Sequence, residues 1–175
     1  VVGGSTPLGS PVGVAEAAAH LFGVALFNDW SARDLQAWEY VPLGPLLGKS
    51  FASSVAAWIT PMAALQAARV PLPVQDPTPL PYLTGSGASL FGLDITLEVS
   101  LNGTVVARPP YREMYWSPTQ MLAHLTVNGA RISSGDLFAF PSDAETLGFA
   151  AIEAMASGVA VVAANAGGIP HIVKH

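Results

Sequence analysis

The first part of the chain carries its apolar residues in short segments rather than in long helical stripes. Residues 1–13 are rich in Gly and Pro and predict a loop. An alanine-rich run from Ala15 predicts a short helix that leads into a buried strand over residues 21–29, where small and apolar residues run together. Residues 31–40 fit one short helix with Ser31 as its N-cap. Two prolines and two glycines in residues 41–50 predict a loop.

The middle of the chain predicts a β-rich body. Residues 53–65 resemble a strand that stops at Pro61, because proline cannot donate to a central ladder. Five prolines within residues 70–83 predict an extended surface connection outside the core. Residues 93–109 alternate apolar and polar positions on both sides of Asn102-Gly103, a strong hairpin signal. Ser117-Pro118 then marks the start of a helix. These elements predict a mainly β, α+β fold.

After Phe138 the pattern changes. Residues 141–173 predict a loop, a helix from about Leu147 to Ala156, an apolar strand and a glycine turn. That order is typical of a short α/β fragment. We therefore divide the chain near Phe140 into residues 1–138 and residues 139–175.

Composition narrows the classes of partner. Hydrophobic residues make up 51% of the chain and charged residues 11%, well below the usual quarter, which indicates an uncharged or partner-covered surface. A net charge of -5 gives no basic footprint for nucleic acid. No cysteine is present, so a metal would be held by oxygen or histidine. The most apolar late stretch, residues 158–170, is too short to span a bilayer, and we expect a cytoplasmic protein without a membrane partner.

Candidate chemistry gathers after the predicted strand at residues 21–29. A carboxylate such as Asp29 at the end of a buried strand is costly unless it is hydrogen-bonded or bound to a cation. Arg33, Gln36 and Tyr40 follow at i+4, i+7 and i+11, so a helix would present them on one face. Lys49 lies just beyond a Gly-rich stretch that could fold it back toward them. The set suits an anionic substrate whose carbonyls are polarised by a metal. A surface helix with solvated polar residues would give the same pattern.

Three segments carry a family resemblance. Residues 27–51, FNDWSARDLQAWEYVPLGPLLGKSF, residues 75–83, QDPTPLPYL, and residues 114–139 resemble successive signatures of the fumarylacetoacetase family, in the family's order. The tract QAWEYVPLGPLLGKSF points to this family within the wider superfamily of metal-dependent β-diketone hydrolases, decarboxylases and hydratases. The resemblance covers about residues 1–138. It implies a mixed β-roll, a homodimer, and Mg²⁺ or Ca²⁺ as cofactor.

The implied reaction is hydrolysis of a carbon–carbon bond in 4-fumarylacetoacetate, a diketo acid, to fumarate and acetoacetate. This is the last step of tyrosine and phenylalanine catabolism. By the same resemblance, Asp29 is a carboxylate ligand of the cation, and Lys49 and Ser53 line its site, although the family usually has threonine at the latter position. Gln36 and Tyr40 match substrate-binding residues.

The catalytic set implied by the family is incomplete in this chain. Arg33 and Lys49 match residues of the catalytic network, but the family places further carboxylate ligands and a general-base histidine before the position of Val1. We therefore expect an N-terminally truncated hydrolase. An inactive partial gene product is the alternative.

The last part of the chain has a resemblance of its own. Residues 141–173 resemble the nucleotide-sugar-binding segment of retaining GT-B glycosyltransferases of the sulfoquinovosyltransferase type. Glu145 and Glu153 match the family's two acidic residues, which contact the donor sugar and the ribose. The resemblance implies a glycosyltransferase fragment in a chimeric chain. An amphipathic helix with solvated acids explains the same residues.

Overall fold

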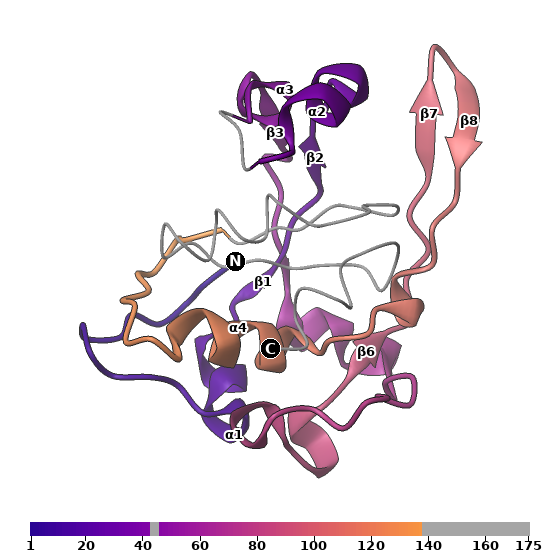
Figure 1. Cartoon of the computed structure of the whole chain (residues 1–175). Helices are drawn as coiled ribbons and strands as arrows, with labels where there is room; N and C mark the ends of the chain where they lie inside the picture. Colours follow the sequence, from indigo (N-terminus) through magenta and orange to yellow (C-terminus); the bar gives the residue numbers. More distant parts are fainter. Residues whose placement is uncertain (43–45, 138–175) are drawn as a thin grey trace.

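The computed structural model describes residues 1–42 and 46–137, which contain short helices and short strands (Figure 1). The α-helices are α1 (Val14–Ala17), α2 (Arg33–Glu39), α3 (Leu47–Ser50) and α4 (Pro118–Thr126). The 3-10 helices are η1 (Ala18–His20), η2 (Met62–Ala68), η3 (Pro81–Leu83), η4 (Gly87–Ser89) and η5 (Tyr111–Glu113). The strands are β1 (Gly23–Val24), β2 (Phe27–Asp29), β3 (Ser53–Val55), β4 (Thr60–Pro61), β5 (Arg69–Val70), β6 (Gly92–Leu93), β7 (Val99–Leu101) and β8 (Thr104–Ala107).

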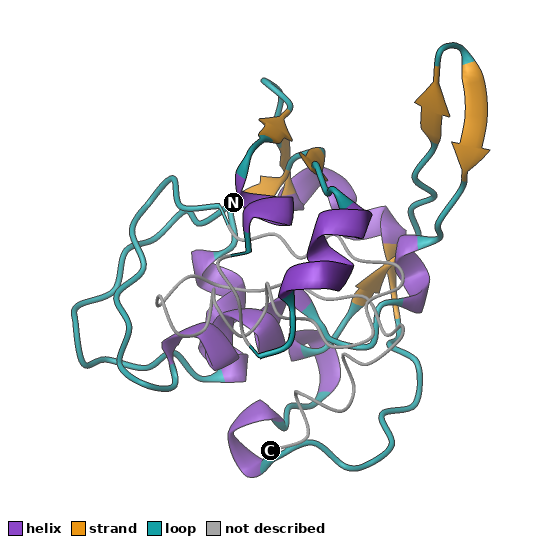
Figure 2. Cartoon of the chain, turned by 45° about the horizontal axis from the view of Figure 1, so that its top comes forward, coloured by secondary structure: helices purple, strands orange, loops and turns teal. Residues whose placement is uncertain are grey.

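The strands of the described residues pair in four small antiparallel sheets. Each sheet has two strands, in the pairs β1–β4, β2–β3, β5–β6 and β7–β8. Helices lie between and beside these pairs (Figure 2). The described part of the chain is therefore a mixture of helices and antiparallel strands, which confirms the α+β class predicted from the sequence. Its strands are too short for the described part to be mainly β. None of its helices is long and apolar enough to cross a membrane.

One of the buried apolar clusters lies between α1 and α4. Leu122 of α4 is fully buried and packs in one cluster with Val2, Val12, Ala17 and Ile132. Ser117 and Gln120 form a reciprocal capping box at the start of α4, so the helix begins where Ser117-Pro118 predicts. Because nearly all of α4 is buried, this helix organises the body of the molecule.

The predicted hairpin is confirmed. Residues Asn102 and Gly103 connect β7 to β8 with φ angles of 49° and 80°. Positive φ at both central positions suits the tight hairpin turns that match strand twist. The hairpin projects away from the other helices and strands of the described residues (Figures 1 and 2).

The proline-rich segment runs as an extended connection, as predicted, but its end belongs to the core. Leu83 is 2% exposed and packs with Val14 and Ala123. The Gln120 side chain donates a hydrogen bond from Nε2 to the Leu83 carbonyl at 2.9 Å and another to Gln75 Oε1 at 2.9 Å. These long-range bonds draw the segment against α4, so its predicted exclusion from the core is wrong at Leu83.

The single buried strand predicted for residues 21–29 is also wrong. The structure has two short strands there, β1 and β2, which pair with different partners. Leu26 lies between them and is 68% exposed. Among the described residues β2 has one neighbouring strand, β3, so an apolar run alone did not produce burial. The second predicted strand likewise divides into β3 and β4, and β4 ends at Pro61 as expected.

Candidate functional site

The predicted site residues lie in one part of the molecule, formed by β2, β3, α2 and α3 (Figure 1). Strands β2 and β3 pair antiparallel over three residues each. Helices α2 and α3 pack against one another beyond the end of β2. The chain therefore brings two segments, residues 27–40 and residues 46–55, into one unit.

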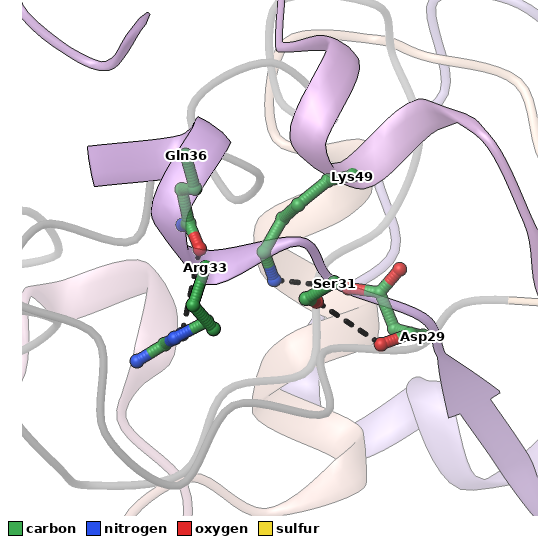
Figure 3. A network of polar contacts seen from close by, with 5 residues as sticks. All are labelled: Asp29, Ser31, Arg33, Gln36 and Lys49. Atoms are coloured by element: carbon green, nitrogen blue, oxygen red, sulfur yellow. Dashed lines mark hydrogen bonds and ion pairs between the residues drawn. The ribbon is translucent and has the colours of Figure 1, made fainter. Parts of the chain in front are cut away.

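Asp29 and Lys49 form the centre of this unit. The Lys49 Nζ donates to Asp29 Oδ2 at 3.0 Å, and the two side chains are 11% and 14% exposed (Figure 3). Asp29 is the last residue of β2, as the sequence predicts, and Lys49 reaches it from α3. The structure confirms that the Gly-rich stretch brings Lys49 back toward the polar residues that follow β2. A pair that is mostly removed from water keeps more of its attraction than an exposed pair does.

Ser53 stands opposite Asp29 in the register of β2 and β3. Directly opposed residues of an antiparallel pair have Cβ atoms about 4.5–5.5 Å apart. The carboxylate and the hydroxyl predicted to be oxygen ligands of a cation are therefore neighbours. Ser53 itself is exposed.

Arg33 and Gln36 share a face of α2. An Arg33 guanidinium nitrogen lies 3.5 Å from Gln36 Oε1, and both side chains appear with the Lys49–Asp29 pair in Figure 3. Tyr40 is the C-cap of the same helix, and its backbone N–H donates to the Gln36 carbonyl at 3.1 Å. The predicted shared face is confirmed for Arg33 and Gln36, and Tyr40 ends the same helix.

Ser31 does not cap α2. The helix begins at Arg33 with Ala32 at the N-cap, and the Ser31 hydroxyl donates instead to the Asp29 carbonyl at 3.1 Å (Figure 3). This bond ties the chain leaving β2 to its last residue. The predicted cap is wrong because the hydroxyl satisfies a nearer acceptor in the turn before the helix.

The loop predicted for residues 41–50 contains a helix. Residues Leu47–Ser50 form α3, and Gly48 within it is buried against α2. Its N–H donates to Glu39 Oε1 at 2.6 Å, and its carbonyl accepts from Ala32 N–H at 2.7 Å. Contacts with α2 thus order a segment whose composition alone favours a loop.

Glu39 was absent from the residues predicted for the site. It is the last residue of α2 and is 9% exposed. A single acid between apolar residues in the tract AWEYV was the available signal, because a buried carboxylate has to find a donor.

The donor set of a cation site is partly present. Across residues 1–42 and 46–137, no three His, Cys, Asp or Glu residues lie close enough together to hold a metal ion. Asp29 provides one carboxylate, whose Oδ2 is paired with Lys49, and Ser53 provides one hydroxyl. Mg²⁺ keeps several waters and Ca²⁺ takes six to eight oxygens, so these residues by themselves do not hold either ion.

The acidic residues of the second resemblance lie outside the described residues. This applies to Glu145 and Glu153 and to the boundary near Phe140. The glycosyltransferase resemblance therefore stays a prediction.

Comparison with known proteins identifies the class to which the chain belongs. The family described as fumarylacetoacetate (FAA) hydrolase C-terminal matches residues 1–160. The chain belongs to the fumarylacetoacetate hydrolase family, as the three sequence segments indicated.

The chain is also similar in sequence to individual proteins. The chain is 48% identical over 144 residues to the fumarylacetoacetase of Mus musculus, a match that covers 79% of this chain and 34% of the relative. It is 47% identical over 144 residues to that of Homo sapiens, with the same coverage. It is 48% identical over 143 residues to that of Arabidopsis thaliana, covering 78% and 34%. The chain thus spans about a third of the length of these relatives.

Proposed function

We propose that this chain contributes to the hydrolysis of a carbon–carbon bond in 4-fumarylacetoacetate, giving fumarate and acetoacetate. The observation that carries the proposal is the mostly buried pair of Asp29 and Lys49 in the tract that resembles the family most specifically. The names of the relatives support the substrate. The same reaction would place the protein in tyrosine and phenylalanine catabolism.

Each polar residue has a proposed task in that reaction. Lys49 and Arg33 add positive charge where negative charge develops on the departing carbon fragment. Gln36 and Tyr40 offer amide and phenol groups that orient the diketo acid. Asp29 holds Lys49 at 3.0 Å and so fixes the position of its ammonium group.

Mg²⁺ or Ca²⁺ is the proposed cofactor. Bound to such a site, the ion would polarise the diketone. Asp29 and Ser53 would supply part of its oxygen ligands, and carboxylates outside the described residues would have to complete the set. The donors among the described residues are too few to hold the ion by themselves.

We further infer a mixed β-roll in the intact protein and assembly as a homodimer. Large apolar side chains are well exposed, among them Trp38 of α2 and Trp58 between β3 and β4, each 86% exposed. Exposed aromatic residues of this size are typical of surfaces that become covered. A cytoplasmic location is proposed on the same family likeness.

A glycosyltransferase activity remains the second candidate, carried by the spacing of Glu145 and Glu153 in the sequence. It requires that residues 139–175 bind a nucleotide sugar. Calorimetry with a UDP-sugar should then show heat that is lost in Glu153→Ala. Absence of heat with the wild-type chain would exclude nucleotide-sugar binding. The chain would then be either the proposed hydrolase or an inactive partial gene product.

The hydrolase proposal is tested with the purified chain in Mg²⁺ or Ca²⁺. Fumarate and acetoacetate are measured after incubation with 4-fumarylacetoacetate. Asp29→Asn should lower kcat by about two orders of magnitude, because the loss of one preorganised electrostatic group at a reaction site typically costs that much.

Asp34→Asn is the matched control. Asp34 is exposed in the first turn of α2, so this variant removes the same charge beside the site without touching Lys49. We expect near wild-type turnover from it. Equal turnover by wild type and Asp29→Asn, or no turnover by wild type with either metal, would count against the proposed activity of this chain.

A further inference from the structure

Helix α3 is anchored to α2 through both backbone groups of one residue. The Gly48 N–H donates to Glu39 Oε1 at 2.6 Å, and the Gly48 carbonyl accepts from Ala32 N–H at 2.7 Å. Ala32 precedes the first turn of α2 and Glu39 ends its last turn. The four residues of α3 are too few to be stable alone, so these bonds hold the helix in place.

The approach of the two helices leaves no room beside Gly48. A Cβ at this position would lie 2.8 Å from the Gln36 backbone nitrogen and 2.9 Å from the Ala32 carbonyl oxygen. The Glu39 carboxylate therefore accepts its hydrogen bond from Gly48, whose backbone already lies in close contact with α2. A hydrogen bond from N–H to a buried carboxylate is among the stronger ones in proteins.

The chain enters α3 in an unfavourable conformation. Leu46 has φ 58° and ψ 33°, in the left-handed region that residues with a Cβ rarely adopt. Its side chain is 6% exposed. This strained residue leads directly into α3, where Glu39 holds the Gly48 N–H two residues later and so helps to keep the backbone in place.

Lys49 follows the anchored glycine directly. Its Nζ lies 3.0 Å from Asp29 Oδ2 across a separation of 20 residues. A lysine ammonium group sits on a flexible four-carbon stem, so a fixed backbone restricts the positions that it can reach. The position of the Lys49 ammonium therefore depends on the bond from Gly48 to Glu39.

We propose that Glu39 is a positioning residue of this site: its carboxylate fixes Gly48, and through it the backbone that carries Lys49 to Asp29. As a role in catalysis this rests on the proposed hydrolase function. The positioning itself is a property of the folded chain and is measured without substrate.

The measurement uses the two lysines of the chain, Lys49 and Lys174. The folded chain is labelled briefly with an amine-acylating reagent, and the two sites are quantified by peptide mass spectrometry. Lys174 serves as the internal reference. The pair with Asp29 and the low exposure of Lys49 should make it slow to react in the wild type, and Asp29→Asn sets the level expected when the pair is lost.

Glu39→Ala should raise the Lys49 rate relative to Lys174 at least about fivefold, the factor equivalent to about 1 kcal/mol, which is the upper range for an exposed ion pair. Glu39→Gln keeps an oxygen acceptor for the Gly48 N–H and should stay near the wild-type rate. Glu39→Asp keeps the charge but shortens the side chain by one methylene group, which moves the acceptor away from the Gly48 N–H. The Lys49 labelling rate should therefore rise in this variant as well. This variant tests the proposal even if Glu39→Ala does not fold.

Ser117→Ala controls for a general loss of stability. Ser117 caps α4, far from the site, and its loss should leave the Lys49 rate unchanged while circular dichroism shows folded protein. The proposal is overturned if folded Glu39→Ala or Glu39→Asp labels at the wild-type rate, or if Glu39→Gln labels as fast as Glu39→Asp. Failure of the hydrolase proposal would appear separately, as absent turnover with the labelling pattern intact.

Discussion

Replacing Gly48 with alanine sets two opposing effects against each other. Alanine is a better helix former than glycine by about 0.5–1 kcal/mol, so helix propensity alone predicts that Gly48→Ala stabilises α3. The added Cβ, however, would meet the Gln36 nitrogen at 2.8 Å, the Ala32 oxygen at 2.9 Å and Glu39 Oε1 at 3.1 Å. Two of these three atoms belong to backbone and move only if a helix moves.

The steric cost decides whether Gly48→Ala stabilises or destabilises the folded chain. Forcing extra atoms into a packed site costs about 1–3 kcal/mol. Moving α3 away from α2 also weakens the bonds from Gly48 to Glu39 and Ala32, each worth about 1 kcal/mol or more. After the gain in helix propensity is subtracted, we expect a net destabilisation of about 2 kcal/mol.

Urea unfolding measures the result. Gly48→Ala should lower the midpoint with an unchanged m-value, and it should raise the labelling of Lys49. Gly103→Ala is the matched control, since a Cβ there meets nothing within 4 Å but the residue has φ 80°. Gly103→Ala should lower the free energy of unfolding by about 1 kcal/mol through backbone strain alone. It should leave the labelling rate of Lys49 unchanged. A Gly48→Ala variant as stable as wild type, with slow Lys49 labelling, would refute the reasoning.

Two further predictions concern the body of the molecule. Ser117→Ala should lower the free energy of unfolding by about 1–3 kcal/mol in urea, because it removes a helix cap and leaves the buried Phe91 N–H without the hydroxyl it donates to at 3.2 Å; an unchanged midpoint would contradict this. Burial lowers the pKa of His124 below 6.5, so the unfolded chain binds more protons than the folded chain as the pH falls through 6.5. The melting temperature should therefore drop on acidification through this range, and the drop should be smaller in His124→Gln. Equal drops in both proteins would rule out a contribution from His124.

Several elements could be predicted from the sequence because they depend on local backbone preferences. The turn at Asn102-Gly103 needs positive φ, which these two residues tolerate better than most. The start of α4 follows from serine and proline acting on the first helical turn. The spacing of Arg33 and Gln36 on one face of α2 follows from helical geometry. None of these requires knowledge of a distant residue.

The sequence by itself thus determined the family, the mixed character of the fold and the segments that contribute Asp29, Gln36 and Lys49. Only the tertiary structure decided that residues 21–29 divide into two strands, that Leu83 is buried and that α3 forms within a segment rich in glycine and proline. It also decided how Lys49 is held, through a bond between Glu39 and Gly48. The reason is that burial and long-range hydrogen bonds depend on which segments meet in space, whereas apolar runs and turn residues specify only what each segment can do locally.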